Sequence, residues 1–236
     1  MTNLVFLPGL NCTSALFQPQ IEALASRHHC QVADNASAYS LDAIASNSLA
    51  AAPESFVLIG LSMGGYIALE MVRQQAHRIE ALVLLDTRAS ADTPDDAQRR
   101  MKTIELAQNG QFEDLHGILW PRLVHPDRTK DQALEAIVLQ MMRDTGPEQF
   151  VRQQTAVMHR PNYGGILETI NIPTLIGVGL QDAITPPEMA RDLAQAIPGS
   201  ALVEFPQCGH LSTLEKPKEV TRAMDDFLQK VTLTKH

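Results

Sequence analysis

The chain has 236 residues with 44% hydrophobic side chains, enough for one sizeable core in one large domain or in one domain with an insertion. Its formal net charge of -8 argues against nucleic acid or an anionic membrane as a general partner. The sequence has no apolar run of about 18 residues and no basic, apolar leader, so we expect a cytoplasmic protein without a membrane span.

The first part of the chain alternates short apolar strands with helices. We predict strands at residues 3–7, 30–33, 56–61 and 79–85, and helices at 14–27, 41–51 and directly after residue 62. Ser14 is the predicted cap of the first helix. This alternation predicts a parallel sheet with right-handed crossovers and with helices on both faces. Ligands of such sheets bind beyond the carboxyl ends of the strands.

The alternation stops after residue 87. No strand pattern is found from 88 to 169, and helices are expected at about 94–109, 112–119, 130–144 and 147–158. Strands return at 172–179 and 201–205, followed by a last helix at about 217–231. We therefore predict a core made of residues 1–87 and 170–236, interrupted by an all-helical insertion over 88–169.

A sharp turn, Gly60-Leu-Ser-Met-Gly64, joins the third strand to its helix. Ser62 at its apex is expected to adopt a sparsely allowed backbone conformation, and the crowded positions two residues to either side require glycine. The turn lifts the Ser62 hydroxyl clear of the sheet and points the first free N–H groups of the helix toward whatever the oxygen attacks. Ser62 is thus a candidate nucleophile, the alternative being a purely structural turn.

A serine nucleophile needs a base, and that base needs a carboxylate that holds the correct tautomer. His210 follows the last strand, and Asp182 follows the strand before it, so we expect them to act as base and acid. Asp86 at the end of strand 79–85 is a rival acid. We favour Asp182 because its loop begins at the flexible Gly179, and we expect Asp86 to bond to backbone at its strand end.

The other histidines and the cysteines are given no chemistry. The remaining histidines are expected to be surface or structural residues: His28, His29, His77, His116, His125, His159 and His236. Cys12, Cys30 and Cys208 are widely spaced, odd in number and in no metal-binding pattern, which predicts free thiols in a reducing compartment.

The chain order Ser, Asp, His resembles that of the α/β-hydrolase family. Four motifs in register carry the resemblance over nearly the whole chain: Leu7-Pro-Gly-Leu-Asn11, Gly60-Leu-Ser-Met-Gly-Gly65, Pro173-Thr-Leu-Ile-Gly-Val-Gly-Leu-Gln-Asp182 and Gly209-His-Leu-Ser-Thr-Leu-Glu-Lys-Pro217. The resemblance implies an α/β-hydrolase fold with a mostly parallel sheet of about six strands, and a serine esterase branch whose helical cap corresponds to 88–169. It also supports Asp182 as the acid and implies no metal or cofactor.

The family resemblance further implies an oxyanion hole made by the backbone N–H groups of Met63 and Leu10. The chain departs from the common His-Gly pattern because Pro8 precedes Gly9, which removes a side chain that often braces this loop. Since the backbone N–H is what matters, Leu10 stays the expected donor.

The insertion contains large apolar residues and basic residues, and each group has two possible roles. Its large apolar residues are Phe112, Leu115, Leu119, Trp120, Leu123, Met141, Met142, Phe150 and Met158. Most of them are expected to pack the helices of the insertion on each other, and Trp120 is the one expected to face the substrate. Its basic residues are typical of a solvated face. An acidic acyl-carrier protein docking on them, as in related carboxylesterases, is the alternative.

These features together predict a serine esterase that cleaves short- to medium-chain carboxylic esters through an acyl-enzyme. A thioesterase, a carbon–carbon bond hydrolase or an acyltransferase on the same triad stays an alternative, because fold and triad do not fix the reaction. So does a hydrolase-derived small-molecule sensor with slow turnover. The expected partner is a small-molecule ester.

Overall fold

The computed structural model describes residues 1–233 of the chain, so His236 lies outside the described residues. Six parallel strands form one sheet in the order β2-β1-β3-β4-β5-β6. The strands are β1 (Thr2–Leu7), β2 (His28–Val32), β3 (Phe56–Leu61), β4 (Ile79–Leu85), β5 (Thr174–Gly179) and β6 (Ala201–Phe205). The predicted sheet of six parallel strands is confirmed.

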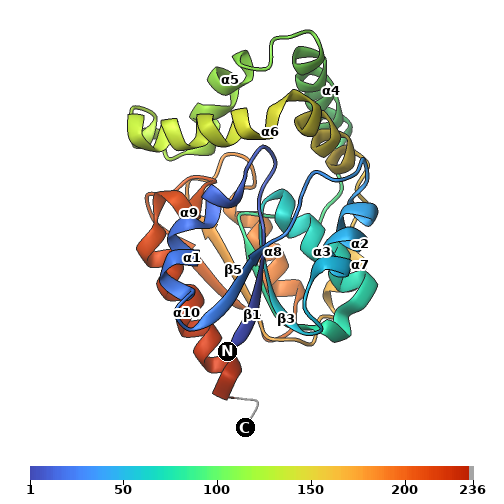
Figure 1. The fold of residues 1–236 in the computed structure, drawn as a ribbon, viewed down its shortest axis with the longest axis vertical. Helices are drawn as coiled ribbons and strands as arrows, with labels where there is room; N and C mark the ends of the chain where they lie inside the picture. The colour runs from blue at the N-terminus through green and yellow to red at the C-terminus, as the bar shows by residue number, and fades with distance from the viewer. Residues whose placement is uncertain (234–236) are drawn as a thin grey trace.

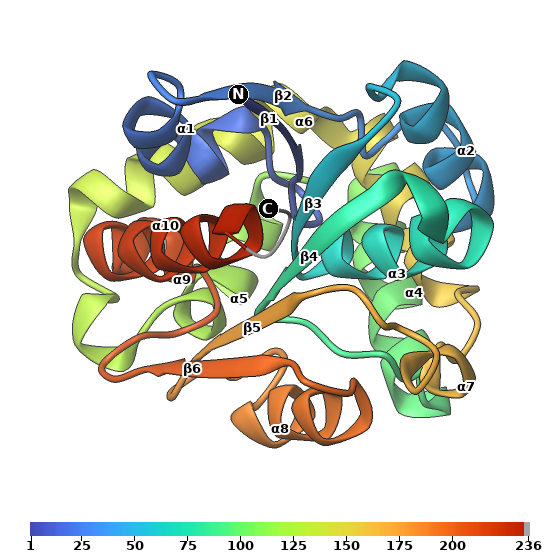
Figure 2. The same ribbon diagram turned by 90° about the horizontal axis from the view of Figure 1, so that it is seen from below.

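Helices cover both faces of the sheet, as Figure 2 shows with α1 and α10 on one side and α2 and α3 on the other. The helices on one face are α1 (Gln18–Leu24), α9 (Ser212–Glu215) and α10 (Pro217–Leu233). The helices on the other face are α2 (Leu41–Ala51), α3 (Met63–Gln75), α7 (Gly164–Leu167) and α8 (Pro187–Ala196). Alternate residues of β1 enter different clusters: Leu4 and Phe6 pack with Phe17, whereas Val5 and Leu7 pack with Ile67. This burial on both faces explains the continuous apolar runs of the strands.

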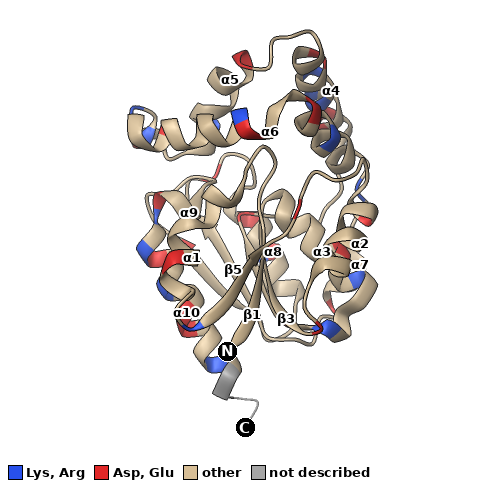
Figure 3. Cartoon of the chain, viewed as in Figure 1, with Lys and Arg blue, Asp and Glu red and all other residues tan. Residues whose placement is uncertain are grey.

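Three helices lie together over the carboxyl ends of the strands (Figure 1). They are α4 (Pro94–Gln108), α5 (Asp114–Leu123) and α6 (Gln132–Met158), which we call the helical layer. Two predicted helices, 130–144 and 147–158, are the two halves of α6, and Gly146 with φ 70° makes the bend between them. In Figure 3 the charged residues lie on helices and loops, and the strands are almost entirely uncharged.

The first predicted helix is wrong in two details. Residues 14–27 form a 3-10 turn, η1 (Ser14–Phe17), and then the separate helix α1. Pro19 has no N–H to continue a helix from η1, but it fits the first turn of α1. The cap is Thr13 rather than Ser14, because Thr13 has the extended backbone of a cap residue and its hydroxyl accepts from the N–H of Ala15.

Two further short 3-10 turns occur, η2 (Ala76–Arg78) and η3 (Pro126–Arg128). Within residues 1–233 no helix is long and apolar enough to cross a lipid bilayer.

Candidate active site

Ser62 occupies the turn between β3 and α3 with φ 56° and ψ -116°, a region that side-chain-bearing residues rarely adopt. The two flanking glycines are required by close backbone contacts. A Cβ on Gly60 would collide with the backbone of Gly64, and a Cβ on Gly64 would collide with the carbonyl group of Leu7. The strained turn is therefore possible only with the glycine spacing seen in the sequence.

The structure brings Ser62, His210 and Asp182 into one hydrogen-bonded chain. His210 Nε2 lies 2.8 Å from Ser62 Oγ, and His210 Nδ1 lies 2.7 Å from Asp182 Oδ2. Both His210 and Asp182 are buried, each with 3% of its surface exposed. If the Ser62 hydroxyl donates to Nε2, the proton of the imidazole must be on Nδ1 and must point at the carboxylate.

The Asp182 carboxylate is held by its own loop. The N–H groups of Ile184 and Thr185 donate to Oδ1 at 2.8 and 2.9 Å, and Thr185 Oγ1 donates to Oδ2 at 2.8 Å. Burial raises the pKa of Asp182, but the charge of His210 and the hydrogen bonds of His210 and Thr185 outweigh burial and lower it. Asp182 therefore stays ionised.

The His210 loop is held by residues to which the sequence analysis gave no role in positioning it. The carbonyl oxygen of Leu123, at the end of α5, accepts from the N–H of His210 at 3.0 Å. Glu215 accepts from the N–H groups of Gly209 at 2.9 Å and His125 at 2.7 Å. These contacts attach the histidine loop to the helical layer, and only a glutamate five residues after His210 hints at them in the sequence.

Asp86 holds two neighbouring loops together but does not contact His210 through any hydrogen bond of the described residues. The N–H of Gly179 donates to its Oδ1 at 2.9 Å, and the hydroxyl of Ser212 donates to its Oδ2. The expected bond of Asp86 to backbone is thus present. Burial, followed by the negative charge of Asp182, raises the pKa of Asp86 to about 8. Of the two candidate acids, Asp182 is the one bonded to the imidazole.

Replacing Asp86 with asparagine is expected to remove a pH dependence of stability. Folded Asp86, with its pKa of about 8, keeps a proton that the unfolded chain releases at about pH 4, so wild-type stability falls as pH rises between these values. The amide oxygen still accepts from Gly179 and the amide N–H₂ donates to Ser212. Urea unfolding at pH 5 and pH 9 should therefore show the variant gaining stability relative to wild type at the higher pH. A difference independent of pH would contradict the raised pKa.

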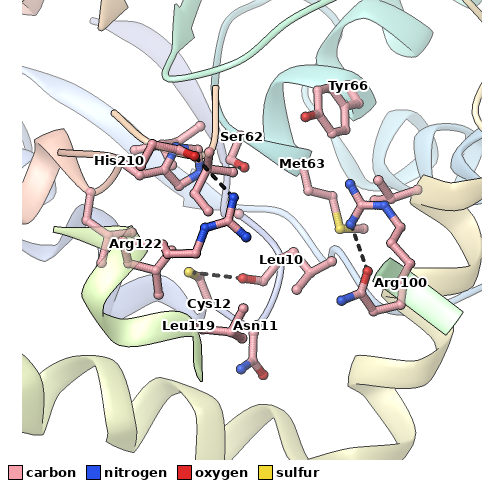
Figure 4. Close-up of a pocket in the computed structure, with 18 of the residues that line it drawn as sticks. Leu10, Asn11, Cys12, Ser62, Met63, Tyr66, Arg100, Leu119, Arg122 and His210 are labelled. Carbon is pink, nitrogen blue, oxygen red and sulfur yellow. Dashed lines mark hydrogen bonds between the residues drawn. The ribbon is translucent and has the colours of Figure 1, made fainter. Parts of the chain in front are cut away.

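Leu10 and Met63 line the same cavity as Ser62 (Figure 4). Met63 is the first residue of α3, so its N–H has no intrahelical acceptor. The loop of Leu10 is braced from two sides: Asn35 Nδ2 donates to the carbonyl of Gly9 at 2.9 Å, and Gln153 Oε1 accepts from the N–H of Asn11 at 2.8 Å. These two side chains connect the Leu10 loop to residues far away in the chain.

A cavity of about 400 Å³ opens beside Ser62 and His210, between the carboxyl edge of the sheet and the helical layer. Of the large apolar residues named above for residues 88–169, Leu119 and Leu123 line it. Four others pack together instead, as expected for most of the set: Phe112, Leu115, Met142 and Phe150.

The structure does not support the expectation that Trp120 faces the substrate. Among the described residues that line the cavity, Trp120 is absent. Its ring is buried with 4% exposure and stacks on His116 at a centroid distance of 5.9 Å, and its Nε1 donates to the carbonyl of Thr129 at 2.9 Å. Leu119 and Arg122 face the cavity instead, because one turn of α5 can present only one side to it.

The three cysteines are free, as expected, and burial raises the pKa of the Cys12 thiol to about 12. Within the described part of the chain, no group of three or more histidine, cysteine, aspartate or glutamate side chains is arranged to hold a metal ion.

Known proteins resemble this chain in sequence and in structure. A family model described as alpha/beta hydrolase fold matches residues 49–217. A pimeloyl-[acyl-carrier protein] methyl ester esterase of Chromobacterium violaceum is 26% identical over 96% of this chain and 94% of its own length. A thermophilic esterase from Thermogutta terrifontis superposes with a TM-score of 0.90 at 28% identity, covering 98% of this chain and 90% of that one.

A second solved structure extends the similarity in fold. The enol-lactonase from Burkholderia xenovorans LB400 has a TM-score of 0.86 at 22% identity, covering 97% of this chain and 91% of that one. The family model spans most of the chain, and the parallel sheet covered by helices on both faces agrees with its description. The chain therefore belongs to the α/β-hydrolase family.

Proposed function

We propose that the protein is a serine esterase that cleaves carboxylic esters of small molecules through an acyl-enzyme. The observation that carries this proposal is the chain of hydrogen bonds from Ser62 through His210 to Asp182 beside a cavity large enough for a small substrate. A nucleophile in contact with a base, and a base oriented by a carboxylate, is the arrangement that activates a serine hydroxyl.

In the proposed reaction, Ser62 Oγ attacks the ester carbonyl and His210 Nε2 accepts its proton. The N–H groups of Met63 and Leu10 stabilise the negative oxygen of the tetrahedral intermediate. Protonated His210 then donates to the leaving alcohol, and ionised Asp182 stabilises the positive charge on the imidazole. A water molecule, activated by the same imidazole, releases the acid and restores Ser62.

We propose the same division of the chain that the sequence indicates, with residues 1–87 and 170–236 as the catalytic core and 88–169 as a cap. The helical layer supports this division because it lies over the carboxyl edge and contributes part of the cavity wall. The location of the protein in the cytoplasm stays a prediction.

Other reactions on the same residues remain alternatives: a thioesterase, a carbon–carbon bond hydrolase, an acyltransferase or a slow sensor. The esterase is favoured because the similar Chromobacterium violaceum protein, matched over 94% of its length, is a methyl ester esterase. That relative's name also includes an acyl-carrier protein, so a carrier-bound ester is an alternative to a free small molecule.

A screen of ester, thioester and diketone substrates tests the proposal, with p-nitrophenyl esters of short and medium chain as the expected best class. Burial lowers the pKa of His210, but the charge and hydrogen bond of Asp182 outweigh it and raise the pKa above its ordinary value. The base must be neutral, so kcat/KM should fall as pH drops, with a midpoint above about 6.5. Preferred turnover of a thioester or a diketone would replace the esterase assignment.

A further inference from the structure

The cavity is positively charged although the whole chain is acidic. Its lining contains four arginines and a single aspartate: Arg88, Arg99, Arg100, Arg122 and Asp96. The chain as a whole carries a formal charge of -8. A positive cavity in an acidic protein raises the local concentration of anions and favours their binding.

Most of the cavity arginines belong to one network on the wall formed by α4 and the preceding loop. The network contains four arginines and two aspartates: Arg88, Arg99, Arg100, Arg160, Asp92 and Asp96. Arg88 bridges Asp92 at 2.8 Å and Asp96 at 3.0 Å, and Arg160 contacts Asp92 at 2.5 Å. Four guanidinium groups share two carboxylates, which leaves an excess of positive charge.

Both aspartates of the network stay ionised, so two negative charges oppose the four guanidinium groups. Burial raises the pKa of each aspartate, but hydrogen bonds from Arg100 and Arg160 lower that of Asp92 below its usual range. The N–H of Thr93 and the neighbouring arginines do the same for the pKa of Asp96. In addition, Arg88 Nε is buried and has no acceptor among the described residues.

Arg122 is the cavity arginine that no carboxylate neutralises. Among the described residues, no Asp or Glu side chain lies within 4.0 Å of its guanidinium, whose Nη2 donates to the carbonyl of Ala183 at 3.2 Å. Arg122 lines the same cavity as Ser62 and His210, and Figure 4 draws these three side chains in one part of the view and Arg100 in another. A carboxylate bound to Arg122 would therefore occupy the cavity that holds the reacting ester.

We propose that the substrate is an ester that carries a free carboxylate, and that Arg122 binds this carboxylate and determines the specificity. This inference rests on the proposed esterase function. The planar guanidinium offers two parallel donors that match the two oxygens of a carboxylate, and it does so without competition from a protein acid. The arginine network opposite supplies a positive field that favours entry of the anion.

The test compares p-nitrophenyl monoesters of adipic and suberic acids with uncharged p-nitrophenyl alkanoates of the same chain length. Wild type is expected to show a kcat/KM roughly 10-fold or more in favour of the anionic esters, since hydrogen bonds to charged groups are worth more than neutral ones. Arg122→Gln should remove most of this preference, and added salt should weaken it in wild type.

The matched control is Arg143→Gln, because Arg143 is an exposed arginine of the helical layer that is paired with Glu113 and is not part of the cavity wall. This variant should keep the wild-type preference. Equal kcat/KM for both ester classes in wild type, or an unchanged preference in Arg122→Gln, would overturn the inference while leaving the esterase intact. If neither class is hydrolysed, calorimetric binding of adipate to wild type and Arg122→Gln still tests carboxylate recognition, and equal binding would overturn it.

Discussion

Replacing Ser62 with alanine is expected to lower kcat for a p-nitrophenyl ester by a factor on the order of 10⁵ to 10⁶, the loss typical of a removed serine nucleophile. The variant cannot form the acyl-enzyme, so only the slow attack of water on an ester held in the cavity remains. His210 would keep its bond to Asp182, since that contact does not involve the hydroxyl. The remaining activity would measure what the cavity and the oxyanion donors contribute alone.

The fold should survive this change, because alanine keeps the Cβ of Ser62 and meets the same backbone strain at φ 56°. Thermal unfolding of both proteins checks this. Ser26→Ala is a matched control, since Ser26 is exposed and precedes β2 at the opposite edge of the sheet. An acyl group found by mass spectrometry on the peptide containing Ser62, in wild type alone, identifies the covalent step. Equal rates in wild type and Ser62→Ala would remove the proposed mechanism.

Replacing Asp182 with asparagine is expected to lower kcat by a factor on the order of 10⁴, the loss seen when the acid of a triad becomes an amide. The asparagine oxygen still accepts from the N–H groups of Ile184 and Thr185, so the loop keeps its shape. The amide nitrogen, however, donates where Oδ2 accepted. His210 must then carry its proton on Nε2, and this tautomer cannot accept a proton from Ser62.

Asp86→Asn is the matched comparison, because it makes the same chemical change at the end of the neighbouring strand. Its loss of activity should be small, since the asparagine keeps the contacts to Gly179 and Ser212 and neither group touches His210 Nδ1. The two variants are compared by kcat for one p-nitrophenyl ester at the pH of maximal wild-type activity. A much larger loss for Asp86→Asn than for Asp182→Asn would show that the acid is Asp86.

The sequence alone determined the sheet, the strained serine turn and the order of the chemical groups along the chain. Strands and helices differ in the period of their apolar residues, and that period is local, so six strands and the helices between residues 88 and 169 could be predicted. Gly60 follows from crowding within the turn, where a Cβ would collide with the backbone of Gly64, whereas the contact that requires Gly64 is with Leu7 of β1. Boundaries were less accurate, as Thr13 and Pro19 show, because one cap or one proline shifts a helix by several residues.

The tertiary structure alone decided which side chains meet. Asp86 and Asp182 both follow apolar strands, and only packing shows that Asp182 reaches the imidazole whereas Asp86 joins two loops. The rotation of α5 buries Trp120 and turns Arg122 toward the cavity, which no spacing in the sequence reveals. Such contacts join residues far apart in the chain, 148 positions in the case of Ser62 and His210. They depend on how helices and strands pack, whereas the sequence pattern reports only whether each segment is a helix or a strand.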